Sequence, residues 1–281
     1  MSRKIRAIFA DYDGTLCPTA TLRSAGGSFI PSSLSDVLWA LSQHVPVCII
    51  SSKDSHFLIR RAPFANAFSC ILGIETLVVK RQSDISPKID RRRLSINKPI
   101  LLENARKLDS LAQKIQTEFP YVMVDRKLTY DDFLAGITVD WRDRKDWEES
   151  RRAIEPYLRQ AISKYIQHPK PLSLEAYSSH PFVDVFAAKC SKRTGFKYVL
   201  SEIKPCLEEG EIVYLGDSEN DNPAFKLADI PIGIRSDSRL QPRLECDFIL
   251  DYDKLASFLQ RLLQNDLRFS DDAIKLLRLP S

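Results

Sequence analysis

Short apolar runs alternate with amphipathic segments over the first third of the chain. Residues 5–10 and 45–50 are continuous apolar runs, which is the pattern of strands buried on both faces. Residues 31–41 carry apolar positions at helical spacing, and residues 54–63 have the capping residue and the closing proline of a short helix. Two further strands are expected at residues 68–72 and 74–79. Strands that alternate with helices in this way favour a parallel sheet with helices on its faces.

The pattern changes after Lys80. Residues 80–88 are polar and lack periodicity, so we interpret them as a linker to a different unit. Beyond it the pattern predicts a helix at 99–119, strands at 121–124 and 134–141, a helix at 146–166, and strands at 172–177 and 182–187. The order helix, strand, strand occurs twice, which predicts an open antiparallel sheet with two helices on one face.

The first pattern returns at Lys192. The expected elements are helices at 192–203, 222–228, 252–263 and 271–279, and strands at 211–215, 230–234 and 247–250. The simplest architecture is a Rossmann-like α/β core with a parallel sheet, formed by residues 1–79 and 188–281. An α+β unit with an open antiparallel sheet, residues 80–187, would then be inserted into this core.

Composition excludes several classes of protein. The 281 residues carry a net charge of only +4, with 44% hydrophobic and 28% charged residues, which does not indicate a nucleic-acid binder. The start of the chain lacks the apolar stretch of a signal peptide, and no window approaches the roughly 18 apolar residues of a membrane span. We therefore expect a cytoplasmic protein with no membrane or nucleic-acid partner.

The six cysteines give no sign of a metal or disulfide framework. They are scattered, no C-x-x-C pair occurs, and several fall in apolar runs. We expect them to be reduced and mostly buried, and the absent ligand spacing speaks against a zinc site.

Two carboxylates follow the first apolar run directly, in the tetrad Asp11-Tyr12-Asp13-Gly14. Two acids one residue apart repel each other and lose hydration, which a metal ion or a reacting phosphate would offset. An acidic turn in which aspartate caps its own backbone is the simpler alternative. A calcium loop is excluded, because the positions that need glycine and glutamate hold Leu16 and Leu22.

A second acidic cluster follows the apolar run at residues 212–215. It reads Gly216-Asp217-Ser218-Glu219-Asn220-Asp221. The carboxyl ends of parallel strands meet at one edge of a sheet, so Asp217 and Asp221 are expected to lie near Asp11 and Asp13. Carboxylate oxygens of this kind suit Mg²⁺ better than zinc or copper.

Hydroxyl groups and a lysine complete the candidate site. Ser51 and Ser52 follow the second strand, where a helix begins, so their hydroxyls and the helix amides would form a phosphate seat. A simple helix-capping role for these serines is the alternative. Lys192 lies just before a helix at the return to the core, where a cation would balance the carboxylates, and Lys189 is its rival.

These four segments resemble the haloacid dehalogenase superfamily, whose motifs have the order Asp-x-Asp-Gly-Thr, a hydroxyl after the second strand, a lysine, and Gly-Asp-x-x-x-Asp. The resemblance implies that Asp11 is the nucleophile that forms an aspartyl phosphate and that Asp13 is the general acid and base. Ser51 and Lys192, with Ser52 beside them, would hold the phosphoryl group. The resemblance also implies Mg²⁺ bound by Asp11, the main-chain carbonyl of Asp13, Asp217 and Asp221, with Ser218 and Asn220 in support.

The inserted unit is similar to the type C2 cap of sugar phosphatases in this superfamily. Arg126, Lys127 and the strand that ends at Arg142 resemble trehalose 6-phosphate phosphatases, so these three cations are candidate substrate-binding residues. A solvent-exposed sheet edge is the alternative for each of them. The sequences Ser51-Ser52-Lys53 and 216–221 resemble mannosyl-3-phosphoglycerate phosphatases instead. The basic run Arg91-Arg92-Arg93 is expected to be a solvated face near the hinge.

The predicted function is a Mg²⁺-dependent phosphomonoester hydrolase for a small phosphorylated sugar, of the trehalose 6-phosphate kind. A glycosyl phosphoglycerate phosphatase is the alternative within the same chemistry. A phosphoryl transferase or mutase, and a catalytically silent phosphosugar-binding module, are alternatives of other classes. The sequence indicates no oligomeric state.

Overall fold

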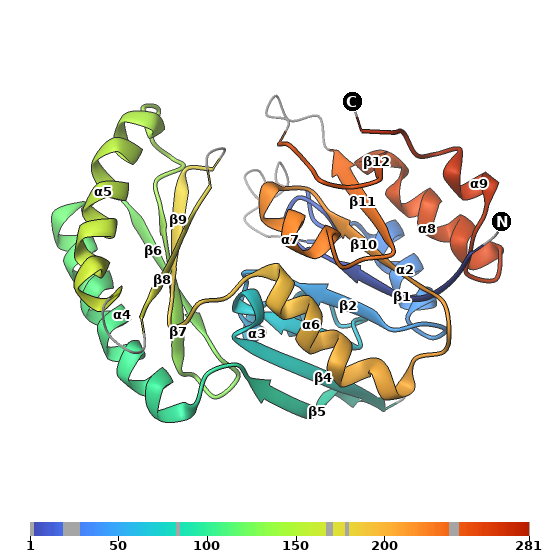
Figure 1. Cartoon of the computed structure of the whole chain (residues 1–281), viewed down its shortest axis with the longest axis horizontal. Coiled ribbons are helices and arrows are strands. Elements are labelled where there is room, and N and C mark those ends of the chain that lie inside the picture. The colour runs from blue at the N-terminus through green and yellow to red at the C-terminus, as the bar shows by residue number, and fades with distance from the viewer. Residues whose placement is uncertain are drawn as a thin grey trace.

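The computed structural model of the chain describes residues 3–18, 29–82, 85–166, 171–177, 180–235 and 242–280. Within these residues the chain forms a nine-stranded sheet and a separate four-stranded sheet. Figure 1 shows the two sheets side by side, with the small sheet and its two helices on the left. The predicted fold class, a mostly parallel α/β sheet with a separate antiparallel sheet, is confirmed.

The large sheet is built around six parallel strands. They are β1 (Arg3–Ala10), β2 (Val47–Ile50), β3 (Ala67–Cys70), β10 (Glu211–Gly216), β11 (Ile230–Arg235) and β12 (Phe248–Asp251), in the spatial order β12-β11-β10-β1-β2-β3. Antiparallel strands β4 (Glu75–Gln82) and β5 (Ile85–Leu94) extend the sheet beyond β3, and the short β13 (Arg268–Phe269) pairs with β1. The apolar runs are central strands because side chains on both of their faces are buried.

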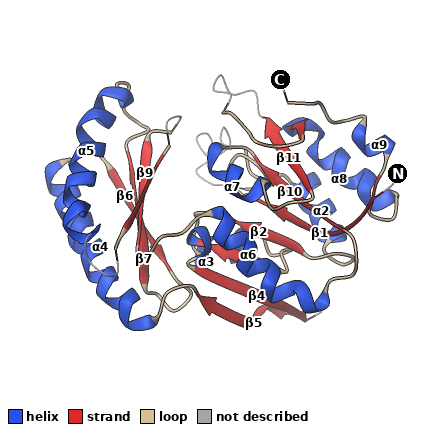
Figure 2. Ribbon diagram, viewed as in Figure 1, coloured by secondary structure: helices blue, strands red, loops and turns tan. Residues whose placement is uncertain are grey.

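Helices cover both faces of the large sheet (Figure 2). One face packs against α2 (Ser32–Leu41), α3 (Ser55–Arg61) and α8 (Leu255–Gln264), and the other packs against α6 (Lys192–Ile203) and the short α7 (Asn222–Phe225). A last short helix, α9 (Asp271–Ile274), follows β13. Capping side chains stabilise the first turn of two of these helices. Asp54 accepts a hydrogen bond from the Phe57 N–H at the start of α3, and Ser191 accepts one from the Thr194 N–H at the start of α6.

The strand order places a switch point between β1 and β10. From β1 the chain adds β2 and β3 on one side, and after the excursion through the small sheet it adds β10, β11 and β12 on the other. The carboxyl ends of β1 and β10 are therefore neighbours, in register from Ile8 opposite Val213 to Ala10 opposite Leu215. Ligands bind at this point in open α/β sheets.

The small sheet and its helices span residues 98–186, which we refer to as the four-stranded unit. Its elements are α4 (Lys98–Glu118), β6 (Met123–Leu128), β7 (Leu134–Asp140), α5 (Trp147–Ile166), β8 (Ser173–Ala176) and β9 (Phe182–Phe186), and the sheet order is β6-β7-β9-β8, all antiparallel. Both helices lie on the sheet face that points away from the large sheet (Figure 1). The other face of this sheet is therefore free to form part of a site.

One expectation is corrected by the structure. Residues 80–88 are not a linker, because residues 80–82 end β4 and residues 85–88 begin β5 of the large sheet. Strand β5 lies at the edge of the sheet, and residues 80–82 of β4 lie beyond its pairing with β3, so neither stretch needs the continuous apolar run that marks a central strand. The four-stranded unit thus begins after Leu94. The division into a core and an inserted domain stays a prediction, with its first boundary better placed near residue 95 than at residue 80.

No helix in the described part of the chain combines the length and the apolar character needed to cross a bilayer.

Candidate functional site

Asp11 lies at the carboxyl end of β1 and is buried, with 5% of its surface exposed. Its N–H donates to the Leu215 carbonyl of β10 at 2.9 Å, which fixes the backbone of the first acidic segment against the second. Burial raises the pKa of the Asp11 carboxyl to about 7, and the neighbouring carboxylates of Asp221 and Asp13 add to the rise while Lys192 opposes it. A buried carboxylate with a raised pKa is typical of a functional site.

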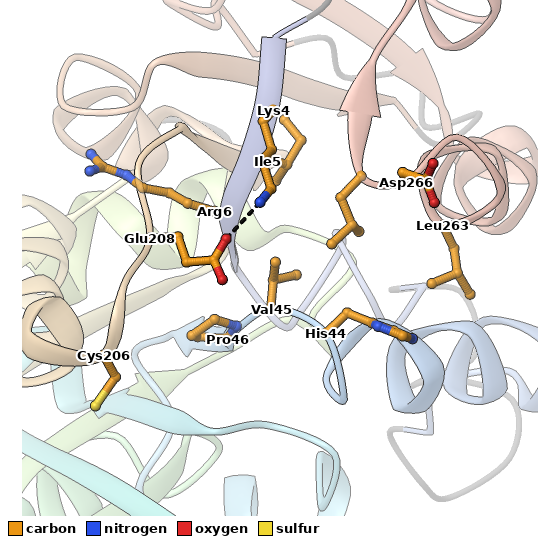
Figure 3. Close-up of a pocket in the computed structure, with 11 residues that line it drawn as sticks. Lys4, Ile5, Arg6, His44, Val45, Pro46, Cys206, Glu208, Leu263 and Asp266 are labelled. Atoms are coloured by element: carbon orange, nitrogen blue, oxygen red, sulfur yellow. Dashed lines mark hydrogen bonds and ion pairs between the residues drawn. The ribbon is translucent and has the colours of Figure 1, made fainter.

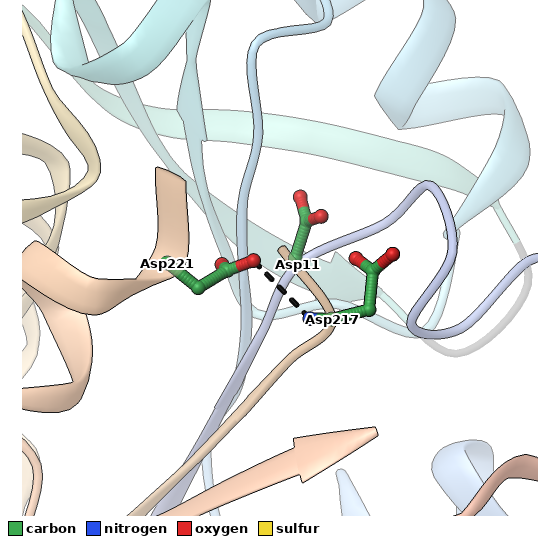
Figure 4. Close-up of side chains that lie close together, drawn as sticks. All are labelled: Asp11, Asp217 and Asp221. Atoms are coloured by element: carbon green, nitrogen blue, oxygen red, sulfur yellow. Dashed lines mark hydrogen bonds between the residues drawn. The ribbon is translucent and has the colours of Figure 1, made fainter. Parts of the chain in front are cut away.

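Asp217 follows β10 and faces Asp11 across the switch point (Figure 4). Its Oδ1 accepts a hydrogen bond from the Thr15 hydroxyl at 3.1 Å. Gly14 makes this approach possible: its φ is +81°, and a Cβ added there would lie 1.9 Å from Asp217 Oδ2. Burial and the Asp11 and Asp221 carboxylates hold the pKa of Asp217 well above its usual range.

Asp221 holds the second acidic segment in shape. Its Oδ2 accepts from the N–H groups of Asp217 and Ser218 at 3.2 and 3.1 Å and from the Ser218 hydroxyl at 3.1 Å. Its Oδ1 accepts from the Tyr214 hydroxyl at 2.6 Å and from Lys192. Both oxygens of Asp221 are thus used by protein donors, which suits an organising role. The Ser218 hydroxyl also lies 2.8 Å from Asn220 Oδ1.

Lys192 is the cation of the cluster. Its Nζ lies 2.6 Å from Asp221 Oδ1 and 3.0 Å from Asp11 Oδ2, and only 1% of the residue is exposed. Burial disfavours its charge, but the two carboxylates outweigh burial and raise its pKa. Lys189, the alternative raised by the sequence, is exposed. The structure therefore brings Lys192, and not Lys189, to the carboxylates.

Ser51 and Ser52 lie at the carboxyl end of β2, next to the acidic cluster. Ser51 is buried, and its Oγ accepts a hydrogen bond from the Lys53 N–H at 3.2 Å. The Lys53 Nζ extends to within 3.6 Å of Asp13 Oδ2. Burial disfavours the charged form of Lys53, but the Asp13, Asp125 and Asp184 carboxylates together outweigh burial and raise the pKa of Lys53. The loop thus presents a hydroxyl and a lysine beside the second carboxylate of the tetrad.

The carboxylates fit a small divalent cation. Carboxylate oxygens of Asp11, Asp217 and Asp221 all lie within 4.8 Å of one another. When all three are ionised, they carry three negative charges against the one positive charge of Lys192. Asp13 Oδ1 is buried and finds no hydrogen-bond partner among the described residues. An all-oxygen donor set with this charge suits Mg²⁺, and Asp11 and Asp217 have oxygens left for it whereas those of Asp221 are already engaged.

A cavity of about 170 Å³ joins this cluster to the four-stranded unit. The large sheet contributes the cluster side, including Asp11, Asp13, Ser51, Ser52, Lys53, Asp217, Ser218 and Asn220. The four-stranded unit contributes Lys127, Thr138, Arg142, His180, Pro181, Phe182 and Asp184. The cavity is thus closed on one side by the free face of the small sheet.

Of the three candidate substrate-binding residues in the four-stranded unit, two line the cavity and one does not. Lys127 and Arg142 line the cavity, whereas Arg126 does not, because alternate residues of β6 point to opposite faces. Arg126 instead pairs with Asp109 of α4 at 2.8 Å. Arg142 is held by Asp140, whose carboxylate lies 2.6 Å from the Arg142 guanidinium.

Several residues at the cavity were not singled out from the sequence. The buried Asp184 pairs with Lys127 Nζ at 3.6 Å and accepts a hydrogen bond from the Thr138 hydroxyl. The rings of His180 and Phe182 stack at 5.2 Å between centroids. An acid at the centre of the apolar run 182–186 was the available signal for Asp184. The sequence contains no comparable signal for His180.

A second cavity, of about 530 Å³, lies at the opposite edge of the large sheet, around the start of β1 (Figure 3). Its polar groups include Lys4 and Glu208, which already pair with each other at 2.6 Å. It is larger than the first cavity but holds no acidic cluster. The chemistry therefore places the candidate site at the smaller one.

Comparisons with known proteins agree with this geometry. The family model described as haloacid dehalogenase-like hydrolase matches residues 139–240. The C-terminal domain of C. albicans trehalose-6-phosphate phosphatase has a similar structure, with a TM-score of 0.66 and 17% identity over 93% of each chain. So does a trehalose-6-phosphate phosphatase related protein, with a TM-score of 0.62 and 17% identity over 92% of this chain and 97% of that one. A sugar phosphatase of haloacid dehalogenase subclass IIB has a TM-score of 0.53 and 15% identity over 93% of this chain and 99% of that one. No curated protein matches the chain in sequence.

The family match over residues 139–240 and the shared fold confirm the resemblance to haloacid dehalogenase-like hydrolases and support the prediction of an enzyme. The identities of the solved structures are low, so these likenesses concern the fold.

Proposed function

We propose that the chain is a Mg²⁺-dependent phosphomonoester hydrolase that acts on a small phosphorylated sugar. The observation that carries this proposal is the meeting of Asp11, Asp13, Ser51 and Lys192 at the junction of one cavity with an acidic cluster. The likeness to solved trehalose-6-phosphate phosphatases and to a subclass IIB sugar phosphatase supports a sugar phosphate as substrate.

The residues divide the reaction into two steps. A carboxylate oxygen of Asp11 attacks phosphorus, the bond from phosphorus to the sugar oxygen breaks, and Asp13 gives a proton to that oxygen. Water then attacks the phosphorus of the aspartyl phosphate, Asp13 takes its proton, and phosphate leaves with Asp11 restored. Ser51, Ser52 and Lys192 hold the phosphoryl oxygens throughout, because one hydrogen-bonding loop and one buried ammonium converge on the site of attack.

Mg²⁺ would be held by Asp11, the main-chain carbonyl of Asp13 and Asp217. When bound, it supplies positive charge that neutralises the carboxylates and the transferring phosphoryl group. Asp221 supports this arrangement by fixing the backbone at Asp217 and Ser218 and by orienting Lys192.

We propose that the four-stranded unit is the cap that reads the sugar. Its cavity face offers donors and acceptors in close succession, with Lys127 and Thr138 beside the Asp184 carboxylate. Sugar hydroxyls can accept from the first two and donate to the third. The Phe182 ring, which also lines the cavity, adds an apolar surface of the kind that sugar rings contact.

A glycosyl phosphoglycerate is the second candidate substrate. The observation in its favour is Lys53, which lines the cavity beside Asp13 and would pair with a carboxylate on the substrate. The cytoplasmic location and the absence of membrane and nucleic-acid partners stay predictions.

The test compares Asp11→Asn with Asp36→Asn, a matched change at an exposed position of α2. Purified proteins are assayed for phosphate release from p-nitrophenyl phosphate and from a panel of phosphorylated sugars and glycosyl phosphoglycerates, with and without Mg²⁺. We expect Asp11→Asn to lose turnover while its circular dichroism spectrum and that of Asp36→Asn stay native. Retained turnover in Asp11→Asn would falsify its role as nucleophile, and phosphoryl transfer to a second sugar in place of release would indicate a transferase.

A further inference from the structure

Arg92 is the middle residue of a basic run whose outer members face away from it. Arg91 and Arg93 are exposed, and both pair with Glu202 of α6, at 3.4 and 3.9 Å. Arg92 instead points toward the four-stranded unit, and only 20% of its side chain is exposed. The alternation of β5 therefore separates one arginine from the other two.

The Arg92 guanidinium joins a buried acid of the large sheet to the four-stranded unit. Its Nε donates to Glu75 Oε1 at 2.6 Å, and its NH1 pairs with Asp131. Glu75 lies on β4 and has no exposed surface, so protein donors must replace the water that its carboxylate loses on burial. The Tyr130 N–H provides a further one, at 3.1 and 3.0 Å from the two carboxylate oxygens.

The contacts to Asp131 and Tyr130 reach one short segment, residues 128–133, which runs from the last residue of β6 to the residue before β7. Core helix α3 holds the same segment from another side. The Asp54 Oδ2, at the start of that helix, accepts from the Leu128 N–H at 3.4 Å, and the His56 ring stacks on the Tyr130 ring at 6.1 Å with an angle of 13°. The β6–β7 connection is thus fastened to two separate elements of the large-sheet unit.

The chain itself crosses between the two sheets at residues 95–97 and 187–191 only, within the described residues. Two crossings permit rotation of one unit against the other about the line that joins them, as in a hinge. Each further contact between the units restricts that rotation. The contacts of Glu75 and Arg92 are the most buried of those that fasten residues 128–133.

We propose that Arg92 is a positioning residue for substrate recognition. Together with Glu75 it fixes the β6–β7 connection against the large sheet, and through β6 and β7 it sets where Lys127 and Thr138 lie relative to Asp11. Lys127 directly precedes the fastened segment, so displacement of the segment moves Lys127 first. This inference rests on the proposed function, because it assumes that the cavity face of the four-stranded unit reads the substrate.

The experiment compares Arg92→Ala with Arg91→Ala, which removes the same charge from the exposed neighbour. Hydrogen–deuterium exchange of the peptide that spans residues 128–133 is measured without any substrate, and kinetics are measured with trehalose 6-phosphate and with p-nitrophenyl phosphate. We expect faster exchange in Arg92→Ala alone. If the released unit holds the productive orientation about one-tenth of the time, KM for trehalose 6-phosphate rises about tenfold. The kcat for p-nitrophenyl phosphate should stay at the Arg91→Ala value.

Removal of Arg92 leaves Glu75 without its cation, so a second variant guards against misfolding. Asp131→Ala removes one arm of the contact at a half-exposed position and should change exchange and KM in the same direction, by less. Arg92→Lys keeps the charge and should restore part of the KM. Equal exchange in Arg92→Ala, Asp131→Ala and Arg91→Ala overturns the proposal, as does an equal loss on both substrates. If the wild type releases no phosphate from these two or from the panel of phosphorylated sugars and glycosyl phosphoglycerates, the proposed function fails, whereas the exchange comparison still decides whether Arg92 fastens the segment.

Discussion

Replacement of Lys192 by methionine tests the electrostatics of the acidic cluster. Methionine keeps the length and helix propensity of the side chain, and the Ser191 hydroxyl still caps α6, so the helix should form as before. What disappears is the ammonium 3.0 Å from Asp11 and 2.6 Å from Asp221. Asp221 keeps its donors from Tyr214 and from the segment at Asp217 and Ser218. Asp11 is therefore the carboxylate that loses its compensation.

The cost follows from the burial of this carboxylate. Removal of one partner from a buried ion pair costs roughly 3–5 kcal/mol of the free energy of unfolding. Asp11 can lower this cost by binding a proton, because its pKa is already raised from 3.8 to about 7 and rises further without the lysine. An acid with a raised pKa in the folded state makes the fold less stable as pH increases from the unfolded pKa to the folded one. The loss in Lys192→Met should therefore be larger at pH 8 than at pH 5.5.

The assay is urea unfolding followed by circular dichroism, in EDTA and then in Mg²⁺. Lys189→Met is the control, because this lysine is exposed and lies three residues away on the same segment. We expect Lys189→Met to match the wild type within about 0.5 kcal/mol at both pH values. Mg²⁺ should restore part of the stability of Lys192→Met, since a divalent cation replaces the missing charge. If Lys192→Met is as stable as Lys189→Met at pH 8 in EDTA, Lys192 does not compensate Asp11 and the reasoning is refuted.

Two further predictions concern the same cluster. Gly14→Ala puts a methyl group 1.9 Å from Asp217 Oδ2, at a position whose φ is +81°. We expect Asp217 to be displaced and the Mg²⁺-dependent kcat/KM to fall by about 100-fold. Wild-type kinetics in this variant would contradict the close approach. In EDTA, the wild-type melting temperature should fall between pH 5 and pH 8, because the raised pKa of Asp11 makes the folded state bind more protons than the unfolded state in that range. Asp11→Asn should flatten this dependence, and an unchanged slope would assign it to other groups.

The sequence pattern predicted most helices and strands, because burial on one or both faces leaves a period in the chain. The helix expected at 192–203 is present with the same bounds, and the parallel strands lie within two residues of their expected positions. The pattern was wrong for residues 80–88 and extended the last helix to residue 279, although α9 ends at Ile274. The first error lies where β5 forms the edge of the sheet, and the second where the chain leaves α9 and Arg278 pairs with Ile249 of β12.

The acidic and phosphate-seat residues could be named from the sequence for a similar reason. Asp11, Ser51 and Asp217 each follow a recognisable strand, and parallel strands bring their carboxyl ends to one edge, whereas Lys192 is the first residue of α6. Asp11, Ser51, Lys192 and Asp217 meet there as expected. The residues of the four-stranded unit could not be sorted in this way. Arg126 and Lys127 are neighbours with similar charge, and only the pleat of β6 decides that one faces the cavity and the other faces α4.

The sequence by itself determined the class of this protein: a parallel α/β sheet whose strand ends carry two acidic segments, a serine pair and a lysine. Local order along the chain was sufficient for this, because the strand that precedes each acidic segment and the serine pair also positions it, and the start of a helix positions the lysine. Only the tertiary structure decided that both carboxylate oxygens of Asp221 accept hydrogen bonds from protein donors, and which of Arg91, Arg92 and Arg93 reaches the four-stranded unit. These choices depend on contacts between residues far apart in the chain, such as Lys192 with Asp11 and Arg92 with Glu75. The hydrophobic periodicity of a single segment cannot predict such contacts.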